Sequence, residues 1–123
     1  MKKINEICGR LAGIIPEDAE KNILFCEVEN TAYEIFYYSL YGDGRTKHSS
    51  EIIDEGNIDV SVVQKGFDNI AKFIRNSEVY NPEQRNVITV TINGSAKRVE
   101  VAQYDKSVGL YKIKKEWKLA NIS

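Results

Sequence analysis

Residues 23–41 read ILFCEVENTAYEIFYYSLY, and this stretch decides the fold class. Its first part, residues 23–28, is apolar except for Glu27, and its second part, residues 33–41, carries aromatic side chains at both odd and even positions. β-Branched and aromatic residues are enriched in strands, and a strand with two apolar faces is typical of the interior of a sheet. The polar residues 29–31 predict a tight connection, so we expect a hairpin.

Three further strands are expected outside this hairpin. The turn sequence Gly42-Asp43-Gly44 leads into residues 45–49, which are more polar and suit an edge strand. In residues 87–92 apolar side chains alternate with threonine, and in residues 98–104 apolar side chains alternate with polar and charged ones. Asn93-Gly94 lies between these two segments and predicts a second hairpin, because the favoured two-residue turn needs positive φ at both positions.

Three segments show the apolar spacing of a helix. Residues 3–15 carry one apolar stripe, and Pro16 ends the segment because the residue before a proline avoids the helical region. Residues 60–76 form a second helix, for which Asp59 is the expected N-cap. Residues 108–119 predict a short helix with a basic face, and a strand over 108–113 stays open as an alternative.

These elements give the order α-β-β-β-α-β-β-α over a single domain of residues 1–123. Residues 50–59, between the third strand and the second helix, are interpreted as a loop. Hairpins join strands in antiparallel fashion, and helices must cover at least one face of the sheet. We therefore predict an α+β fold with two layers, in which the antiparallel sheet packs against helices.

Composition excludes several classes of protein. Apolar residues make up 42% of the 123 residues and charged residues 28%, as in an ordinary globular protein. No apolar run approaches the roughly 20 residues that a membrane helix needs, and the amino-terminal segment lacks the apolar core of a signal peptide. We expect a cytoplasmic protein that does not contact a membrane.

The charges are unevenly distributed along the chain. Residues 1–60 hold 12 acidic and 6 basic side chains, whereas residues 61–123 hold 6 acidic and 11 basic ones, and the net charge is −1. A dedicated nucleic-acid binder is more often basic overall. The acidic half suits a basic protein partner, and a solvated surface with scattered charges explains the pattern equally well.

No constellation of residues points to catalysis. His48 is the only histidine, and no second group for acid–base chemistry stands out beside it, so an exposed histidine on an edge strand is the simpler interpretation. Cys8 and Cys26 are too few and too far apart for a metal cluster or a disulfide framework, and we expect two buried thiols. The sequence therefore predicts no enzyme activity, no cofactor and no metal.

Two sets of residues are candidates for contacting a partner. One is an acidic segment without a base just before the second helix, and the other is a pair of tyrosines on the sheet face away from the helices. These candidate partner-binding residues are Glu51, Asp54, Glu55, Asp59, Tyr37 and Tyr41. For the acidic residues the competing interpretation is a solvated loop, and for the tyrosines it is a strand whose side chains face the core. Four lysines near the carboxyl end suit either a solvated helix face or nucleic acid.

Four short motifs carry a resemblance to a known family. They are Ile14-Ile15-Pro16, Glu20-Lys21, Glu27-Val28 and Phe36-Tyr37-Tyr38. With the opening helix, the tyrosine-rich second strand and the closing LYKIKKEW segment, the chain resembles the YezG/EsaG-like bacterial immunity proteins. The resemblance spans most of the chain.

The resemblance implies a stoichiometric inhibitor without catalytic residues. Such a protein binds the toxic domain of a bacterial effector, commonly a basic nuclease, by occluding its active site or substrate groove, and it does not itself contact nucleic acid. The acidic half of this chain would complement a basic toxin. Two alternatives stay open: a protein-interaction or regulatory module unrelated to toxins on the same fold, and a small enzyme or nucleic-acid binder.

Overall fold

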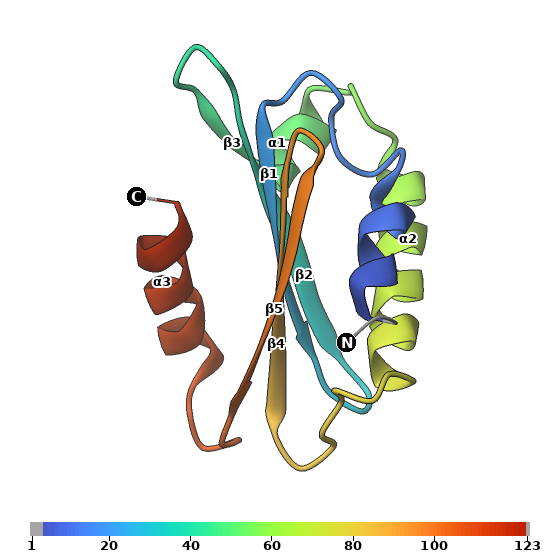
Figure 1. The fold of residues 1–123 in the computed structure, drawn as a ribbon, viewed down its shortest axis with the longest axis vertical. Coiled ribbons are helices and arrows are strands. Elements are labelled where there is room, and N and C mark those ends of the chain that lie inside the picture. Colours follow the sequence, from blue (N-terminus) through green and yellow to red (C-terminus); the bar gives the residue numbers. More distant parts are fainter. Residues whose placement is uncertain (1–3, 123) are drawn as a thin grey trace.

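The computed structural model describes residues 4–122 and contains a five-stranded antiparallel sheet with strand order β3-β2-β1-β4-β5 (Figure 1). In chain order the elements are the 3₁₀ helix η1 (Ile4–Leu11), β1 (Lys21–Val28), β2 (Tyr33–Leu40), β3 (Thr46–His48), α1 (Ser49–Asp54), α2 (Val60–Arg75), β4 (Arg85–Asn93), β5 (Ala96–Tyr104) and α3 (Leu110–Asn121). The predicted α+β class with an antiparallel sheet is confirmed.

Strand β1 lies at the centre of the sheet, as its apolar sequence requires. It pairs with β2 on one side, starting from Val28 opposite Tyr33, and with β4 on the other. The second predicted hairpin joins β4 to β5, with Asn93 opposite Ala96, and Gly94 adopts a φ of +62° in the turn. Both predicted hairpins are therefore confirmed.

The larger part of the core lies on the sheet face covered by η1 and α2 (Figure 1). Alternate β1 residues Leu24, Cys26 and Val28 point to this face, as the two-residue period of a strand requires. They pack with buried residues of η1 and of α2, such as Leu11 and Ile70. Cys26 is a buried free thiol, as is Cys8 of η1, as predicted.

Helix α3 covers the opposite face of the sheet (Figure 1). Ile113 and Trp117 of α3 pack against the other set of β1 residues, Ile23 and Phe25, in a second and smaller apolar cluster. The indole Nε1 of Trp117 also donates a hydrogen bond of 2.8 Å to the hydroxyl of Thr89 in the sheet. The carboxyl-terminal segment is thus a helix and not a strand, and the sheet has helices on both faces.

Two segments differ from the sequence predictions. The helix predicted over residues 3–15 is the shorter η1, because Gly13 adopts a φ of +82° that no helix contains; residue 3 lies outside the described residues. Part of the loop predicted over residues 50–59 is the helix α1. The His48 ring accepts a hydrogen bond from the Ser50 backbone, and the Glu51 carboxylate accepts one from the His48 backbone, so the two side chains form a capping box.

The predicted start of α2 is confirmed, because Asp59 caps the helix through the Ser61 backbone N–H. Gly66 of α2 lies so close to the turn after η1 that a Cβ atom there would come within 2.2 Å of Ile14.

None of the helices in residues 4–122 is long and apolar enough to cross a membrane.

Candidate functional site

The acidic residues predicted to contact a partner have mostly local structural roles. Glu51 completes the capping box of α1, Glu55 forms an ion pair of 2.7 Å with Lys47, and Asp59 caps α2. Hydrogen bonds from Ser61 lower the pKa of Asp59 below its ordinary value. Asp54 is exposed on α1. The four carboxylates therefore lie on one stretch of surface. Two of them, Glu51 and Asp59, also accept hydrogen bonds from backbone N–H groups, and Glu55 pairs with a side chain.

The prediction that Tyr37 faces a partner is wrong. Tyr37 is fully buried on the face covered by α2, its hydroxyl donates a hydrogen bond of 2.8 Å to the Ile14 carbonyl, and burial raises its pKa to about 12. Because both faces of β2 are aromatic, the sequence pattern did not show which tyrosines are covered. Tyr41 is half-buried just beyond β2, with the cationic groups of Arg45 and Lys47 4.9 and 5.7 Å from its ring centre.

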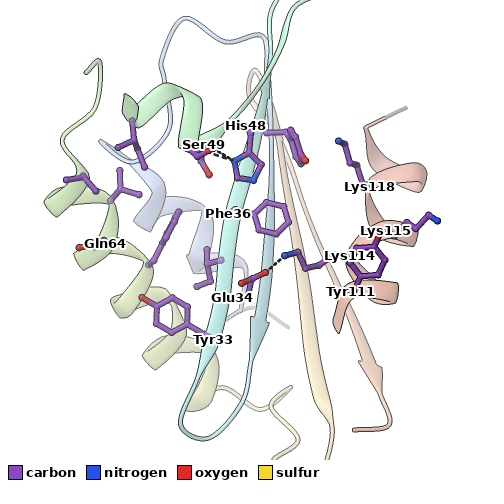
Figure 2. Close-up of a pocket in the computed structure, with 17 residues that line it drawn as sticks. Tyr33, Glu34, Phe36, His48, Ser49, Gln64, Tyr111, Lys114, Lys115 and Lys118 are labelled. Atoms are coloured by element: carbon purple, nitrogen blue, oxygen red, sulfur yellow. Dashed lines mark hydrogen bonds and ion pairs between the residues drawn. The ribbon is translucent and has the colours of Figure 1, made fainter. Parts of the chain in front are cut away.

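The described part of the chain contains a groove of about 880 Å³ between α2 and α3, with β2 at its floor (Figure 2). It is lined by side chains from both faces of the sheet. Tyr33 and Ile35 belong to the α2 face, whereas Glu34 and Phe36 belong to the α3 face. One groove can contain both sets only if it wraps around the edge of β2, so this edge is open.

The edge is open because β3 is short. It pairs with β2 only at Tyr38, Ser39 and Leu40, and the chain then turns away into α1. Ser49 marks the turning point, where its hydroxyl accepts a hydrogen bond of 3.2 Å from the Tyr37 backbone N–H. Within residues 4–122, no strand pairs with the outer edge of β2 over residues 33–36. Native proteins usually cover or pair such an edge.

The α3 wall of the groove is cationic and aromatic. Tyr111, Lys114, Lys115 and Lys118 line it, and Tyr111 is 80% exposed (Figure 2). Lys114 forms an ion pair with Glu34 and lies 5.5 Å above the ring centre of Phe36. The other two lysines are exposed. Three ammonium groups thus face one carboxylate, and this side of the groove carries net positive charge.

The α2 wall is mainly apolar. Val60 is 49% exposed, Ile53 of α1 is partly exposed, and Val63 and Phe67 lie buried behind them. Tyr33 closes the lower end of the groove (Figure 2), and its hydroxyl donates a hydrogen bond to Asp68 of α2. Burial and this hydrogen bond raise the pKa of Tyr33 to about 12, so the phenol stays protonated. The two walls of the groove therefore differ in chemistry.

His48 lies at the upper end of the groove and is half-buried, which corrects the expectation of an exposed histidine (Figure 2). Its ring stacks on Phe36 with 5.1 Å between ring centres. Burial lowers the pKa of His48, and Lys114 and Lys118 lower it further against the opposite effect of Glu51. The neutral ring accepts a hydrogen bond at Nδ1 from the Ser50 backbone N–H, so this nitrogen is occupied by the cap of α1.

Sequence reasoning missed the groove, although a signal for one wall was present. Tyr111, Lys114, Lys115 and Lys118 follow the i, i+3, i+4, i+7 spacing of a single helix face. The sequence alone leaves these lysines as a solvated helix face or a nucleic-acid site, because nothing local shows which element lies opposite. Among residues 4–122, no group of histidine, cysteine and acidic side chains has the arrangement of a metal site.

In comparisons with known proteins, no family model matches the chain and no curated protein matches its sequence.

Proposed function

We propose that this chain is an immunity protein, which binds a bacterial toxin domain stoichiometrically and neutralises it by covering the active site or the substrate groove of the toxin. Two arguments support the proposal. The first is the resemblance carried by motifs such as Ile14-Ile15-Pro16 and Phe36-Tyr37-Tyr38. The second, which carries most weight, is the groove around the open edge of β2 between an apolar and a cationic wall.

The groove favours a polypeptide as the bound molecule. Its floor is a strand edge, whose backbone groups match those of another extended chain. Tyr111 and Val60 leave large apolar surfaces exposed at the rim, which are typical of protein-binding sites. Lysine side chains beside them contribute to specificity, because they select a partner of complementary charge.

The proposed toxin is a nuclease that is basic overall, and the chain then acts in the cytoplasm, where nucleic acids are exposed to such an enzyme. The acidic segment around Asp54 attracts a basic toxin over a distance and raises the association rate. The groove then holds the bound toxin and controls the dissociation rate. The inhibitor itself has no catalytic activity, uses no cofactor and contacts neither nucleic acid nor a membrane.

The test is co-expression of the chain with the product of the adjacent gene. If that product is the toxin, cells that express it alone stop growing, and cells that express both proteins grow and yield a one-to-one complex on size exclusion. Growth arrest in the presence of the chain, with no complex, would refute the proposal. A stable complex with an adjacent gene product that is not toxic would instead favour an interaction module unrelated to toxins.

A further inference from the structure

The outer edge of β2 directs specific backbone groups into the groove. In an antiparallel ladder, alternate residues direct their N–H and C=O groups to the same side. The N–H of Tyr37 points outward, because it donates to Ser49 on the side away from β1. By this alternation, Ile35 and Tyr33 also direct their backbone groups outward, and both residues line the groove. Tyr33 and Ile35 therefore offer two successive pairs of outward backbone groups, with which a further strand can form hydrogen bonds.

The walls of the groove set the side-chain pattern that a further strand would need. Successive side chains of a strand point to opposite faces, so those of an added strand would point alternately to α2 and to α3. The α2 wall offers Val60 and Ile53, which suit apolar side chains. The α3 wall offers Lys115 and Lys118, which suit carboxylates. The matching segment therefore alternates apolar and acidic residues.

We propose that an extended segment of the toxin, with alternating apolar and acidic side chains, binds in the groove as a sixth strand beside β2. The segment pairs with the open edge at residues 33–36, a length of about four residues or roughly 13 Å. Its carboxylates contact Lys115 and Lys118, and its apolar side chains cover Val60 and Ile53. This inference rests on the proposed function, because the segment belongs to the toxin.

Single-stranded nucleic acid is the competing ligand for lysines beside aromatic rings. Two observations favour the peptide. The Glu34 carboxylate lies inside the groove beside Lys114, where it repels phosphates and reduces the local positive charge. The apolar α2 wall and the free strand edge match backbone and side-chain groups of a polypeptide, and among residues 4–122 no cationic side chain lines that wall.

The test is an NMR titration of the ¹⁵N-labelled full chain with the synthetic peptide acetyl-VDVEVDV-amide. The matched control peptides are acetyl-VKVKVKV-amide and a scrambled acidic peptide of the same composition, and an octauridylate represents nucleic acid. We expect saturable amide shifts at Tyr33, Ile35 and α3, with slower hydrogen exchange at the two β2 amides, for the alternating acidic peptide only. Equal binding of the scrambled peptide, no binding of the alternating one, or octauridylate binding in its place would overturn the inference.

Matched variants test the two kinds of contact. Lys115→Glu reverses a groove charge, and Lys112→Glu makes the same change on an exposed position of α3 outside the groove. We expect Lys115→Glu to weaken peptide binding about tenfold or more and Lys112→Glu about twofold or less. Equal effects would show general electrostatics and overturn the proposed pairing.

Tyr33→Pro removes an outward N–H at the first position of β2, where proline is tolerated, and Tyr33→Ala removes the same ring while keeping the N–H. Weaker binding of the proline variant than of the alanine variant is expected for strand pairing, and equal binding of the two would contradict it. The titration needs no toxin, so the two proposals can fail separately. A toxin complex that forms without peptide binding would leave the immunity function standing and refute the added strand.

Discussion

The hydroxyl of Ser49 lies 3.2 Å from the backbone nitrogen of Tyr37 and accepts its hydrogen bond at the point where β3 ends. Both residues are buried. A side-chain oxygen thus replaces the carbonyl that a longer β3 would supply, and it satisfies the last paired position of the edge. This contact lets the chain turn into α1 and leaves the rest of the β2 edge open.

Ser49→Ala is therefore expected to destabilise the fold. It leaves the buried Tyr37 N–H without its acceptor, which costs about 1–3 kcal/mol. Urea unfolding followed by circular dichroism measures the loss. Ser50→Ala, on the exposed neighbouring position of α1, is the matched control and should cost less than half as much. Equal losses would mean that Ser49 contributes to stability only through its place in α1, and not through the hydrogen bond from Tyr37.

Thr89→Val tests the attachment of α3 to the sheet. The substitution keeps the shape of the side chain but leaves the Trp117 Nε1–H, which now donates to Thr89 over 2.8 Å, without an acceptor. We expect a loss of about 1–3 kcal/mol. Trp117 is the only tryptophan, so its fluorescence reports unfolding around α3 directly. Thr91→Val, on the same strand and only partly buried, should change stability much less; a similar loss there would contradict the role of this hydrogen bond.

A buried carboxylate on the α3 side of the sheet makes stability depend on pH. Glu27 is 2% exposed, and Arg85, its nearest cation, lies 4.0 Å away and also pairs with Glu29. The pKa of Glu27 is raised from 4.5 to about 7, mainly by burial and also by the Glu29 and Glu34 carboxylates, against the effect of Arg85. The folded chain therefore holds a proton that the unfolded chain releases.

The sign of this linkage follows from the raised pKa. Between pH 5 and pH 8 the unfolded chain has already released most of the Glu27 proton while the folded chain still holds it, so the free energy of unfolding falls as pH rises, on the order of 2–3 kcal/mol. Glu27→Gln removes the titrating group. Denaturant unfolding of both proteins at pH 5 and pH 8 should show a smaller fall for the variant. Parallel pH profiles would contradict a raised pKa at Glu27.

His48 gives the opposite dependence at lower pH. Its pKa is lowered, and its Nδ1 must be unprotonated to accept from Ser50. Protonation as pH falls below about 6.5 favours the unfolded chain and breaks the cap. His48→Asn keeps a capping side chain that does not titrate. Both proteins are compared in the Glu27→Gln background. The free energy of unfolding of the chain that keeps His48 should fall more between pH 7 and pH 5 than that of the chain with His48→Asn. An equal fall would assign the acid sensitivity to other groups.

The strands were predictable because their signals are local. The apolar residues 23–28, the aromatic residues 33–41 and the Asn93-Gly94 turn signal each indicate backbone pairing within a few residues. Helix α1 was missed because its cap is a histidine, which is outside the usual set of capping residues. Tyr37 was assigned to the surface because aromatic residues occupy both faces of β2, and only the packing of α2 shows which face is covered.

The candidate site was less predictable for a physical reason. The groove exists because β3 stops at His48 and because α2 and α3 lie on opposite faces of the same edge. Both facts depend on contacts between residues far apart in the chain, such as Lys114 with Glu34. The sequence therefore showed the lysine-rich face of α3 but not the strand edge beside it.

The central claim is that the toxin is held in the groove of β2, and binding kinetics of the complex with the adjacent gene product test it most directly. Association and dissociation rates are measured for Lys115→Glu in the groove and for Asp54→Lys on the exposed surface of α1, at two salt concentrations. We predict that Lys115→Glu raises the dissociation rate about tenfold or more, whereas Asp54→Lys slows association mainly at low salt. An unchanged dissociation rate in Lys115→Glu would contradict the account.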